Sequence, residues 1–167
     1  MVSHTEQIQS FEPIAGPDAR ILILGSMPGV ASLEAGQYYA HPRNAFWRIM
    51  GDVFGANPDL PYEARRSILI EKGVAVWDVL KYCRREGSLD ANIRDGVPND
   101  FATFFNTHQG ISRVLLNGGT AARGYGKYVQ DTVPNLAAIA VPSTSPAYAS
   151  MRYEEKLRHW LEALIAI

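Results

Sequence analysis

Residues 19–29 have the sequence ARILILGSMPG, in which four apolar side chains stand in a row between Arg20 and Gly25. A short apolar run that stops at glycine predicts a strand buried on both faces. Three further runs have the same character and are separated by segments of helical period: residues 74–77, 114–116 and 136–141. We therefore predict an α/β fold of three layers, α/β/α, with a central, mainly parallel four-stranded sheet.

Segments of helical period lie between these strands, and most carry recognisable start or stop signals. Helices are predicted from Asn44 to near Gly55, from Pro61 to Gly73, from Asn99 or Asp100 to His108, over residues 119–129 and at the C-terminus. The last of them is expected to carry one apolar face: Tyr153, Leu157, Trp160, Leu161, Leu164 and Ile165. Residues 81–98 are expected to form a polar loop.

The composition limits the class of protein. A chain of 167 residues suits a single domain, residues 1–167, and its net charge of −1 argues against a strongly basic coat but not against a local basic patch. Cys83 is the only cysteine, which excludes a disulfide framework, a zinc ribbon and a cysteine-ligated iron–sulfur cluster. The longest apolar run is too short for a membrane span, and the first six residues lack a secretory pattern. We expect a soluble, cytoplasmic protein.

The carboxyl ends of parallel strands meet at one edge of a sheet, and ligands of open α/β sheets bind beyond that edge. The residues that follow the four predicted strands are 25–29, Asp78, 117–119 and 142–143. We therefore expect the functional site among these residues.

Several common site patterns are absent from the sequence. Residues 118–127 resemble a phosphate-binding loop, but Ala121 replaces a required glycine and no Ser or Thr follows Lys127. Neither Ser26 nor Ser143 lies in a G-x-S-x-G elbow, and the four histidines lack metal-ligand spacing. We expect no metal and no cofactor.

The second informative segment is residues 37–47, QYYAHPRNAFW. Asn44 precedes the apolar helical pattern by two residues, so local sequence favours a helix N-cap. Tyr38 and Tyr39 offer flat faces to a planar ligand, although tyrosines of this kind more often pack against their neighbours. Local sequence leaves both interpretations of these residues open.

Together the motifs resemble the uracil-DNA glycosylase superfamily. They are G-x-x-P-G at residues 25–29, His-Pro-x-Asn-x-Phe-Trp at residues 41–47, and Pro-Ser-Thr-Ser-Pro-Ala at residues 142–147. The middle motif looks most like the mismatch-specific uracil/thymine branch, and the other two look like the deoxyinosine (hypoxanthine) branch. The resemblance runs from about Arg20 to the C-terminal helix, with each motif at its expected strand end.

The resemblance implies roles for individual residues. Met27 stands where the family has a water-activating Asp or Asn, and in the deoxyinosine branch the catalytic asparagine is instead the one at Asn44. Tyr39 matches an aromatic residue that stacks on the flipped base. Asp78 stands where uracil-specific members have an asparagine, and Val141 stands where several members have His or Asn to contact the leaving group.

The other expected site residues come from the same motifs and from the basic residues near them. The residues expected to bind the base are Gly25, Ser26, Met27, Pro28, Gly29, Tyr39, Phe46, Asp78 and Ser143. The residues expected to contact DNA are Ser143, Thr144, Ser145, Pro146, Lys81 and Arg84. Ser145 stands at the loop position where the family has a bulky leucine that wedges the duplex open, and the resemblance leaves Pro146, Tyr148 and Met151 as alternative wedges.

The resemblance implies a monofunctional hydrolase that flips a deaminated base from double- or single-stranded DNA and leaves an abasic site. Asp78 would accept the N1–H of hypoxanthine, or the N3–H of uracil, although a helix cap or an ion pair with Lys81 or Arg84 is equally compatible with local sequence. We expect a monomer active in base excision repair at the nucleoid. The alternatives are a uracil- or mismatch-specific glycosylase, a non-catalytic nucleic-acid-binding relative, and a hydrolase of free nucleosides.

Overall fold

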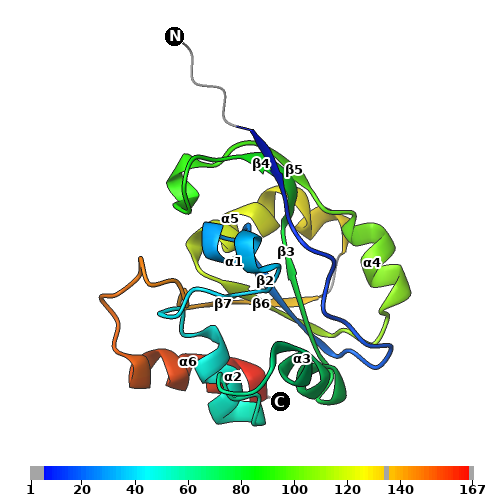
Figure 1. The fold of residues 1–167 in the computed structure, drawn as a ribbon. Helices are drawn as coiled ribbons and strands as arrows, with labels where there is room; N and C mark the ends of the chain where they lie inside the picture. The colour runs from blue at the N-terminus through cyan, green and yellow to red at the C-terminus, as the bar shows by residue number, and fades with distance from the viewer. Residues whose placement is uncertain (1–5, 134–135, 166–167) are drawn as a thin grey trace.

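The computed structural model describes residues 6–133 and 136–165. Four strands form its central sheet: β2 (Ile21–Gly25), β3 (Val74–Asp78), β6 (Arg113–Asn117) and β7 (Ala137–Val141). Their order is β3-β2-β6-β7, and every neighbouring pair is parallel (Figure 1). The predicted four-stranded parallel sheet is confirmed, and all four carboxyl ends lie at one edge.

Helices cover both faces of this sheet. One face carries α2 (Phe46–Phe54), α3 (Tyr62–Glu71) and α6 (Tyr153–Ile165), which lie below the sheet in Figure 1. The other face carries α4 (Phe101–Thr107) and α5 (Gly119–Tyr128). The short α1 (Val30–Ala35) follows β2. The three-layer α/β/α architecture is therefore confirmed.

Strand β2 shows why the sheet must be covered twice. Ile23 belongs to the same core cluster as Phe46 of α2 and Trp160 of α6. Its neighbour Leu24 points to the opposite face and belongs to the cluster that contains Phe104 of α4. All of β2 except its first residue is buried, because successive side chains of a strand alternate between the two helical layers.

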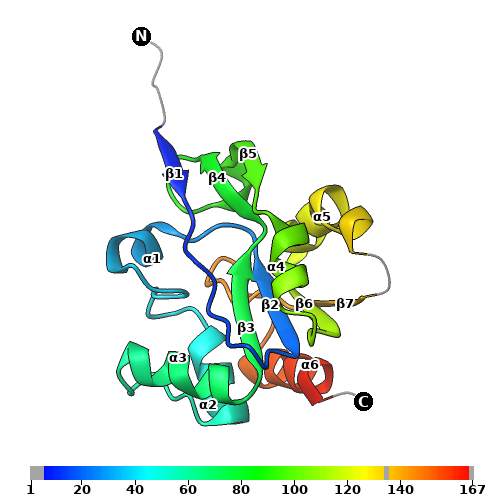
Figure 2. The same ribbon diagram turned by 90° about the vertical axis from the view of Figure 1, so that its right-hand side faces the viewer.

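A second, antiparallel sheet was not predicted. It consists of β1 (Gln7–Gln9), β4 (Leu80–Arg84) and β5 (Arg94–Pro98), in the order β1-β4-β5. The expectation of a polar loop over residues 81–98 is wrong, since β4 and β5 form a hairpin whose tip holds the 3-10 turn η1 (Asp90–Asn92). Figure 2 shows β4 continuing from the end of β3 into this sheet. The sheet is small and polar, so its strands lack the long apolar runs that identify the central ones.

The helix boundaries largely follow the predicted signals. Asp100 caps α4, because its carboxylate accepts a hydrogen bond from the amide of Thr103 at 3.1 Å. Gly55 ends α2 with a φ of 83°, a left-handed conformation that favours glycine. The apolar face predicted for α6 is only partly correct, since Leu161 and Ile165 are 38% and 59% exposed.

Two further observations concern localisation. No helix in the described part of the chain is long and apolar enough to cross a membrane. Most of the N-terminal segment considered for a secretory signal, residues 1–5, lies outside the described residues.

Candidate active site

A hollow of about 460 Å³ opens at the carboxyl ends of β2, β3 and β6. We call it the pocket. Residues predicted from three separate motifs line it together: Gly25 to Gly29, Tyr39, Asn44, Asp78 and Ser143 to Pro146. Segments more than 100 residues apart in the chain thus form one site, as the parallel topology requires.

Asn44 lies at the start of α2, on the wall of the pocket. Its side-chain Oδ1 accepts a hydrogen bond from the backbone amide of Phe46 at 2.9 Å. Its backbone amide donates to the carbonyl of His41 at 2.9 Å. The N-cap of α2 is Ala45, one residue later than predicted, and the bond from the Phe46 amide holds Asn44 just before the helix. This bond also fixes the side chain, and an amide with one bond on Oδ1 still has an acceptor lone pair and two N–H donors for a water molecule.

Asp78 ends β3 beside Gly25, its register partner on β2. The side chain is buried, and its Oδ2 has no hydrogen-bond partner in the described structure. Burial, aided by the negative charge of Asp90, raises the pKa of Asp78 to about 7, while Arg85 opposes the shift. The cation that acts on this carboxyl is therefore Arg85. The ion pair with Lys81 or Arg84 that local sequence allowed is not formed among the described residues.

Tyr39 lines the pocket, with its hydroxyl close to Gly25 at the end of β2. Its ring stacks on that of Phe46, with centroids 4.1 Å apart and planes 27° apart. Its backbone has a φ of 54°, which is uncommon for a residue other than glycine. Phe46 was predicted to touch the base, but it is fully buried behind Tyr39 and does not line the pocket. Its role is to hold the tyrosine ring.

The Tyr39 hydroxyl is the second buried polar group at the pocket without a hydrogen-bond partner. Burial and the nearby charge of Asp78 raise its pKa, and the proximity of Asn117 opposes the shift. The amide of Asn117 is already engaged, because it donates to Thr144 Oγ1 and accepts from the Thr144 amide, both at 3.0 Å. Since buried polar groups are normally paired, two free atoms at one pocket point to a polar ligand.

Gly25 makes room for both groups. A Cβ atom at this position would lie 2.6 Å from Asp78 Oδ1 and 2.9 Å from the Tyr39 hydroxyl oxygen. Any other residue would push these two side chains away from the strand end. The first glycine of the G-x-x-P-G motif is thus required by the geometry of the pocket.

The loop after β7 is fixed to the rest of the site by Thr144. This side chain is 1% exposed, and its carbonyl accepts the amide of Ala45 next to Asn44 at 3.0 Å. Thr144 was predicted to contact DNA, but it is buried and its polar groups are bonded within the protein. Its neighbours Ser143, Ser145 and Pro146 remain candidates for that contact, since none of them is buried.

The tip of the β4–β5 hairpin forms a wall of the pocket that sequence reasoning missed. Ser26 Oγ donates to Asp90 Oδ1 at 2.8 Å, and the amide of Val30 donates to Ser88 Oγ at 2.8 Å. Arg85 is buried and donates to the carbonyl of Pro28 at 2.6 Å. These bonds hold the G-x-x-P-G motif against the hairpin. The polar composition of residues 81–98 was the available signal, but it was interpreted as a loop.

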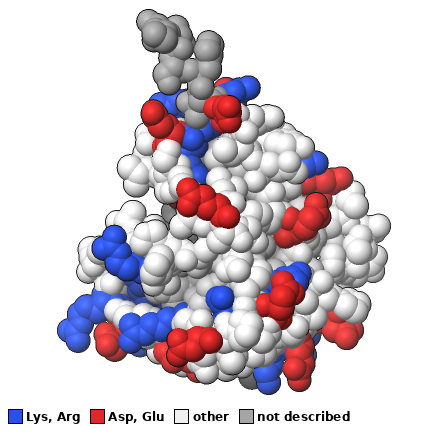
Figure 3. All heavy atoms as spheres, in the orientation of Figure 1, with Lys and Arg blue, Asp and Glu red and all other residues white. Residues whose placement is uncertain are grey.

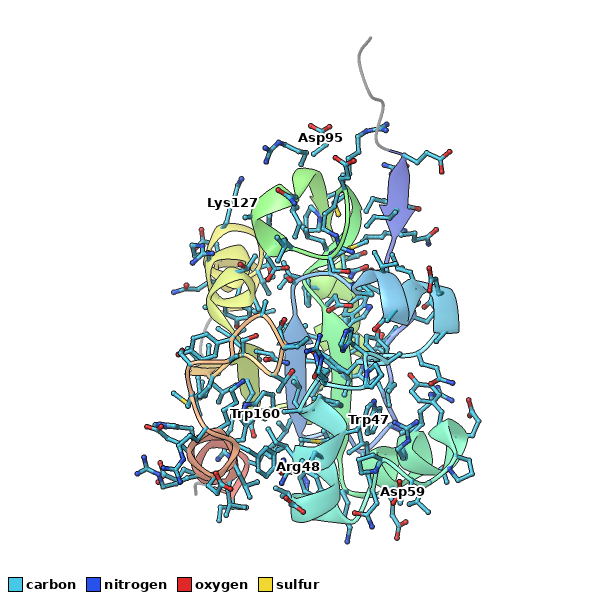
Figure 4. The ribbon with its side chains drawn as sticks, turned by 60° about the vertical axis from the view of Figure 1, so that its left-hand side comes forward. Trp47, Arg48, Asp59, Asp95, Lys127 and Trp160 are labelled. Carbon is cyan, nitrogen blue, oxygen red and sulfur yellow. The ribbon has the colours of Figure 1, made fainter. Side chains whose placement is uncertain are left out.

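The basic residues predicted to contact DNA lie elsewhere. Neither Lys81 nor Arg84 lines the pocket, and Arg84 Nε is 3.7 Å from Asp95 Oδ2. Figure 3 shows acidic and basic side chains mixed over the upper part of one face and basic ones gathered at its lower left. In Figure 4, Asp95 lies at the opposite end of the molecule from Arg48 of α2. DNA contacts by Lys81 and Arg84 therefore stay a prediction.

Comparison with known proteins identifies the family. The model of the uracil DNA glycosylase superfamily matches residues 13–166, nearly the whole chain. The chain belongs to this superfamily. It is therefore a DNA glycosylase, and its substrate is DNA.

Relatives support the same conclusion. The chain is 38% identical to the hypoxanthine DNA glycosylase of Methanosarcina barkeri over 111 residues, which are 66% of this chain and 70% of that protein. It is 36% identical to the hypoxanthine DNA glycosylase of Methanosarcina acetivorans over 114 residues, 68% and 72% of the two chains. A solution NMR structure from Methanosarcina acetivorans, provisionally described as a uracil DNA glycosylase, superimposes with a TM-score of 0.79 at 29% identity, covering 95% of this chain and 99% of that one.

The site contains no evident place for a metal. In residues 6–133 and 136–165, no group of three or more His, Cys, Asp or Glu side chains is arranged to hold one.

Proposed function

We propose that this protein is a monofunctional glycosylase that hydrolyses the N-glycosidic bond of deoxyinosine in DNA and releases hypoxanthine. The observation that carries the proposal is the buried Oδ2 of Asp78, which has no hydrogen-bond partner among the described residues. The buried hydroxyl of Tyr39, which lines the same pocket, also has none. Both groups suit the polar edge of a planar base.

Base selection follows from the charge of Asp78. Hypoxanthine presents a donor at N1, whereas adenine presents an acceptor there, so an ionised carboxylate accepts from the first and repels the second. A buried polar group left unpaired costs about 1–3 kcal/mol, which corresponds to roughly one to two orders of magnitude in preference. With a pKa of about 7, the carboxyl is partly ionised near neutral pH, and binding of an N–H donor favours its ionised form.

Asn44 acts on the water. The glycosidic bond lies inside stacked DNA, so the nucleotide must rotate into the pocket before reaction. The bond then breaks with positive charge on the sugar, and a water molecule adds to it. Asn44, fixed by its bond to the Phe46 amide, orients this water, although an amide is too weak a base to remove a proton fully.

The 25–29 segment stabilises the leaving base, on which negative charge develops. This segment lines the pocket, and we expect backbone N–H groups around Ser26, Met27 and Gly29 to donate to that charge. Val141 is 5% exposed and apolar, so it offers no leaving-group contact at the position where several relatives have His or Asn.

The remaining parts of the proposal concern context. We infer that residues 1–167 act as one domain, as a monomer, in base excision repair in the cytoplasm at the nucleoid. Uracil is the second candidate base, because its N3–H would bind to the same Asp78 oxygen.

The test is release of the base. Wild-type protein is incubated in EDTA with a duplex that contains deoxyinosine, with one that contains deoxyuridine, and with free deoxyinosine. The proposal predicts free hypoxanthine, an intact but abasic strand, and little hydrolysis of the free nucleoside. Binding of the lesion duplex without release would instead favour a non-catalytic module, and faster hydrolysis of the nucleoside would favour a nucleoside hydrolase.

A further inference from the structure

A second hollow of about 650 Å³ adjoins the pocket and shares Tyr39, His41 and Asn44 with it. Its other walls come from α2, from α3 and from the segment that leads into α6. Four cationic side chains line it, and no Asp or Glu does: Arg43, Arg48, Arg65 and Lys156. We call this hollow the basic groove.

Three of the four cations of the basic groove are held in place by neutral groups. The Arg48 guanidinium lies 3.6 Å from the ring centroid of Tyr153, and that of Arg65 lies 4.6 Å from the ring centroid of Trp47. Lys156 donates to the carbonyl of Tyr148 at 2.6 Å. A guanidinium stacked on a ring has a restricted orientation and keeps N–H donors at its edge for an anion.

These cations have no direct carboxylate partner among the described residues, although Asp52 accepts a hydrogen bond from the hydroxyl of Tyr153, the ring on which Arg48 lies. Within residues 6–133 and 136–165, none of the four side chains forms an ion pair with a carboxylate. The protein as a whole has a net charge of −1, so a groove with four cations and no lining carboxylate is a local concentration of positive charge. Such a groove attracts a polyanion.

We propose that the basic groove binds the phosphodiester backbone of the DNA strand that carries the flipped nucleotide, on one side of that nucleotide. The proposal rests on the proposed function, because the strand is placed by the base in the pocket. The strand is favoured over other anions since the groove begins at Asn44, where the sugar of a flipped nucleotide would lie, and continues away from it. Tyr153 adds aromatic surface beside the cations.

The test compares two pairs of substitutions that remove the same charge. Arg43→Gln/Arg48→Gln removes two exposed cations of the basic groove. Arg20→Gln/Lys72→Gln removes two exposed cations at the amino ends of β2 and β3, the opposite edge of the sheet. Binding to a duplex with a non-cleavable deoxyinosine analogue is measured by fluorescence anisotropy from 50 to 300 mM salt.

The groove pair is expected to lower affinity by roughly 10-fold at low salt and to reduce the slope of log K against log salt by about 0.9 for each lost phosphate contact. The control pair should leave the slope unchanged. Arg43→Gln alone should give about half the change in slope. Thermal melts establish that each variant is folded.

Strand length then locates the contact. Shortening the lesion strand on one side of deoxyinosine should abolish the difference between wild type and the groove pair, while shortening it on the other side should preserve the difference. Inorganic phosphate at millimolar concentration should compete weakly, and equally strong competition by phosphate and by the oligonucleotide would indicate a small-anion site and overturn the proposal.

An unchanged salt slope in the groove pair, or an equal loss in the control pair, would also overturn it. Failure of the proposed function is distinguishable from failure of the groove. If the duplex binds through the groove but wild type releases no hypoxanthine, the groove stands and the assigned reaction fails. If wild type releases hypoxanthine and the slopes do not differ, only the groove proposal fails.

Discussion

The pocket and the basic groove meet at Tyr39, His41 and Asn44, yet they differ in charge: two carboxyls and one cation, Arg123, line the pocket, whereas the charged side chains that line the groove are all cations. The pocket holds a buried carboxyl and an unpartnered hydroxyl, and Asp90 adds a second negative charge at its wall. The groove is lined by four cations, and none of them forms an ion pair with a carboxylate of the described residues. This difference separates two tasks of a glycosylase: one surface selects a base, and the other suits a phosphate backbone.

Asn44 stands at the boundary and carries the largest expected effect. Asn44→Ala should slow single-turnover cleavage of a deoxyinosine duplex at least about 100-fold, because water is no longer oriented. It should also lose about 1 kcal/mol of stability with the bond to the Phe46 amide.

Asn44→Ser is the matched control for that experiment. Serine restores an acceptor for the helix start but not the amide, so stability should recover while cleavage stays slow. Recovery of cleavage in the serine variant would show that Asn44 serves only the helix.

Ionisation of Asp78 should lower the free energy of unfolding as the pH rises. The folded state holds the Asp78 proton to a pKa of about 7, whereas the unfolded chain releases it near 4. Unfolding therefore becomes easier between about pH 4 and pH 7, since the native state binds more protons there.

Asp78→Asn should remove this dependence. The uncharged amide of the variant still lacks a hydrogen-bond partner, which offsets part of the benefit. We expect the free energy of unfolding of the variant to exceed that of wild type by on the order of 2 kcal/mol at pH 8, and the difference to vanish near pH 4. Denaturant unfolding of both proteins at the two pH values measures it. A wild type that is more stable than the variant at pH 8 would show that Asp78 has a partner in solution.

The hydroxyl of Tyr39 should have the smallest effect. Tyr39→Phe keeps the stacking on Phe46 and removes a buried group without a hydrogen bond, so the free protein should be unchanged or up to about 1 kcal/mol more stable. Affinity for a non-cleavable deoxyinosine duplex should fall by up to about 10-fold if the hydroxyl binds the base edge.

Tyr39→Ala separates the ring from the hydroxyl. It should cost about 1–3 kcal/mol of lesion binding, because the stacking face is lost as well. Equal affinities of wild type and both variants for the deoxyinosine duplex would show that Tyr39 does not contribute to binding of the base.

The sequence predicted the central sheet because its strands are apolar on both faces, as β2 between two helical layers must be. It also placed Gly25 and Asp78 at one rim, because parallel strands share their carboxyl edge. Asn44 was assigned to the site by the resemblance to the superfamily. The sequence did not predict the β1-β4-β5 sheet, whose polar strands have no comparable run.

The sequence pattern does not predict contacts between residues that are far apart in the chain. The position of Ser88 and Asp90 at the pocket depends on the missed hairpin. Phe46 and Thr144 belong to the right motifs, but burial makes them supports for Tyr39 and Asn44. The basic groove joins α2 to the segment before α6, so its cations come from parts of the chain with no common motif.

The most direct test of base selection is single-turnover cleavage of deoxyinosine, deoxyuridine and deoxyadenosine duplexes by wild type, Asp78→Asn and Asp78→Ala. Asp78→Ala should slow cleavage of bases that carry the N–H, deoxyinosine most, by roughly 10- to 100-fold. Asp78→Asn should narrow the preference for deoxyinosine over deoxyadenosine, since an amide can present either a donor or an acceptor. Equal slowing of all three substrates in both variants would contradict the account, because Asp78 would then support the pocket without reading the base.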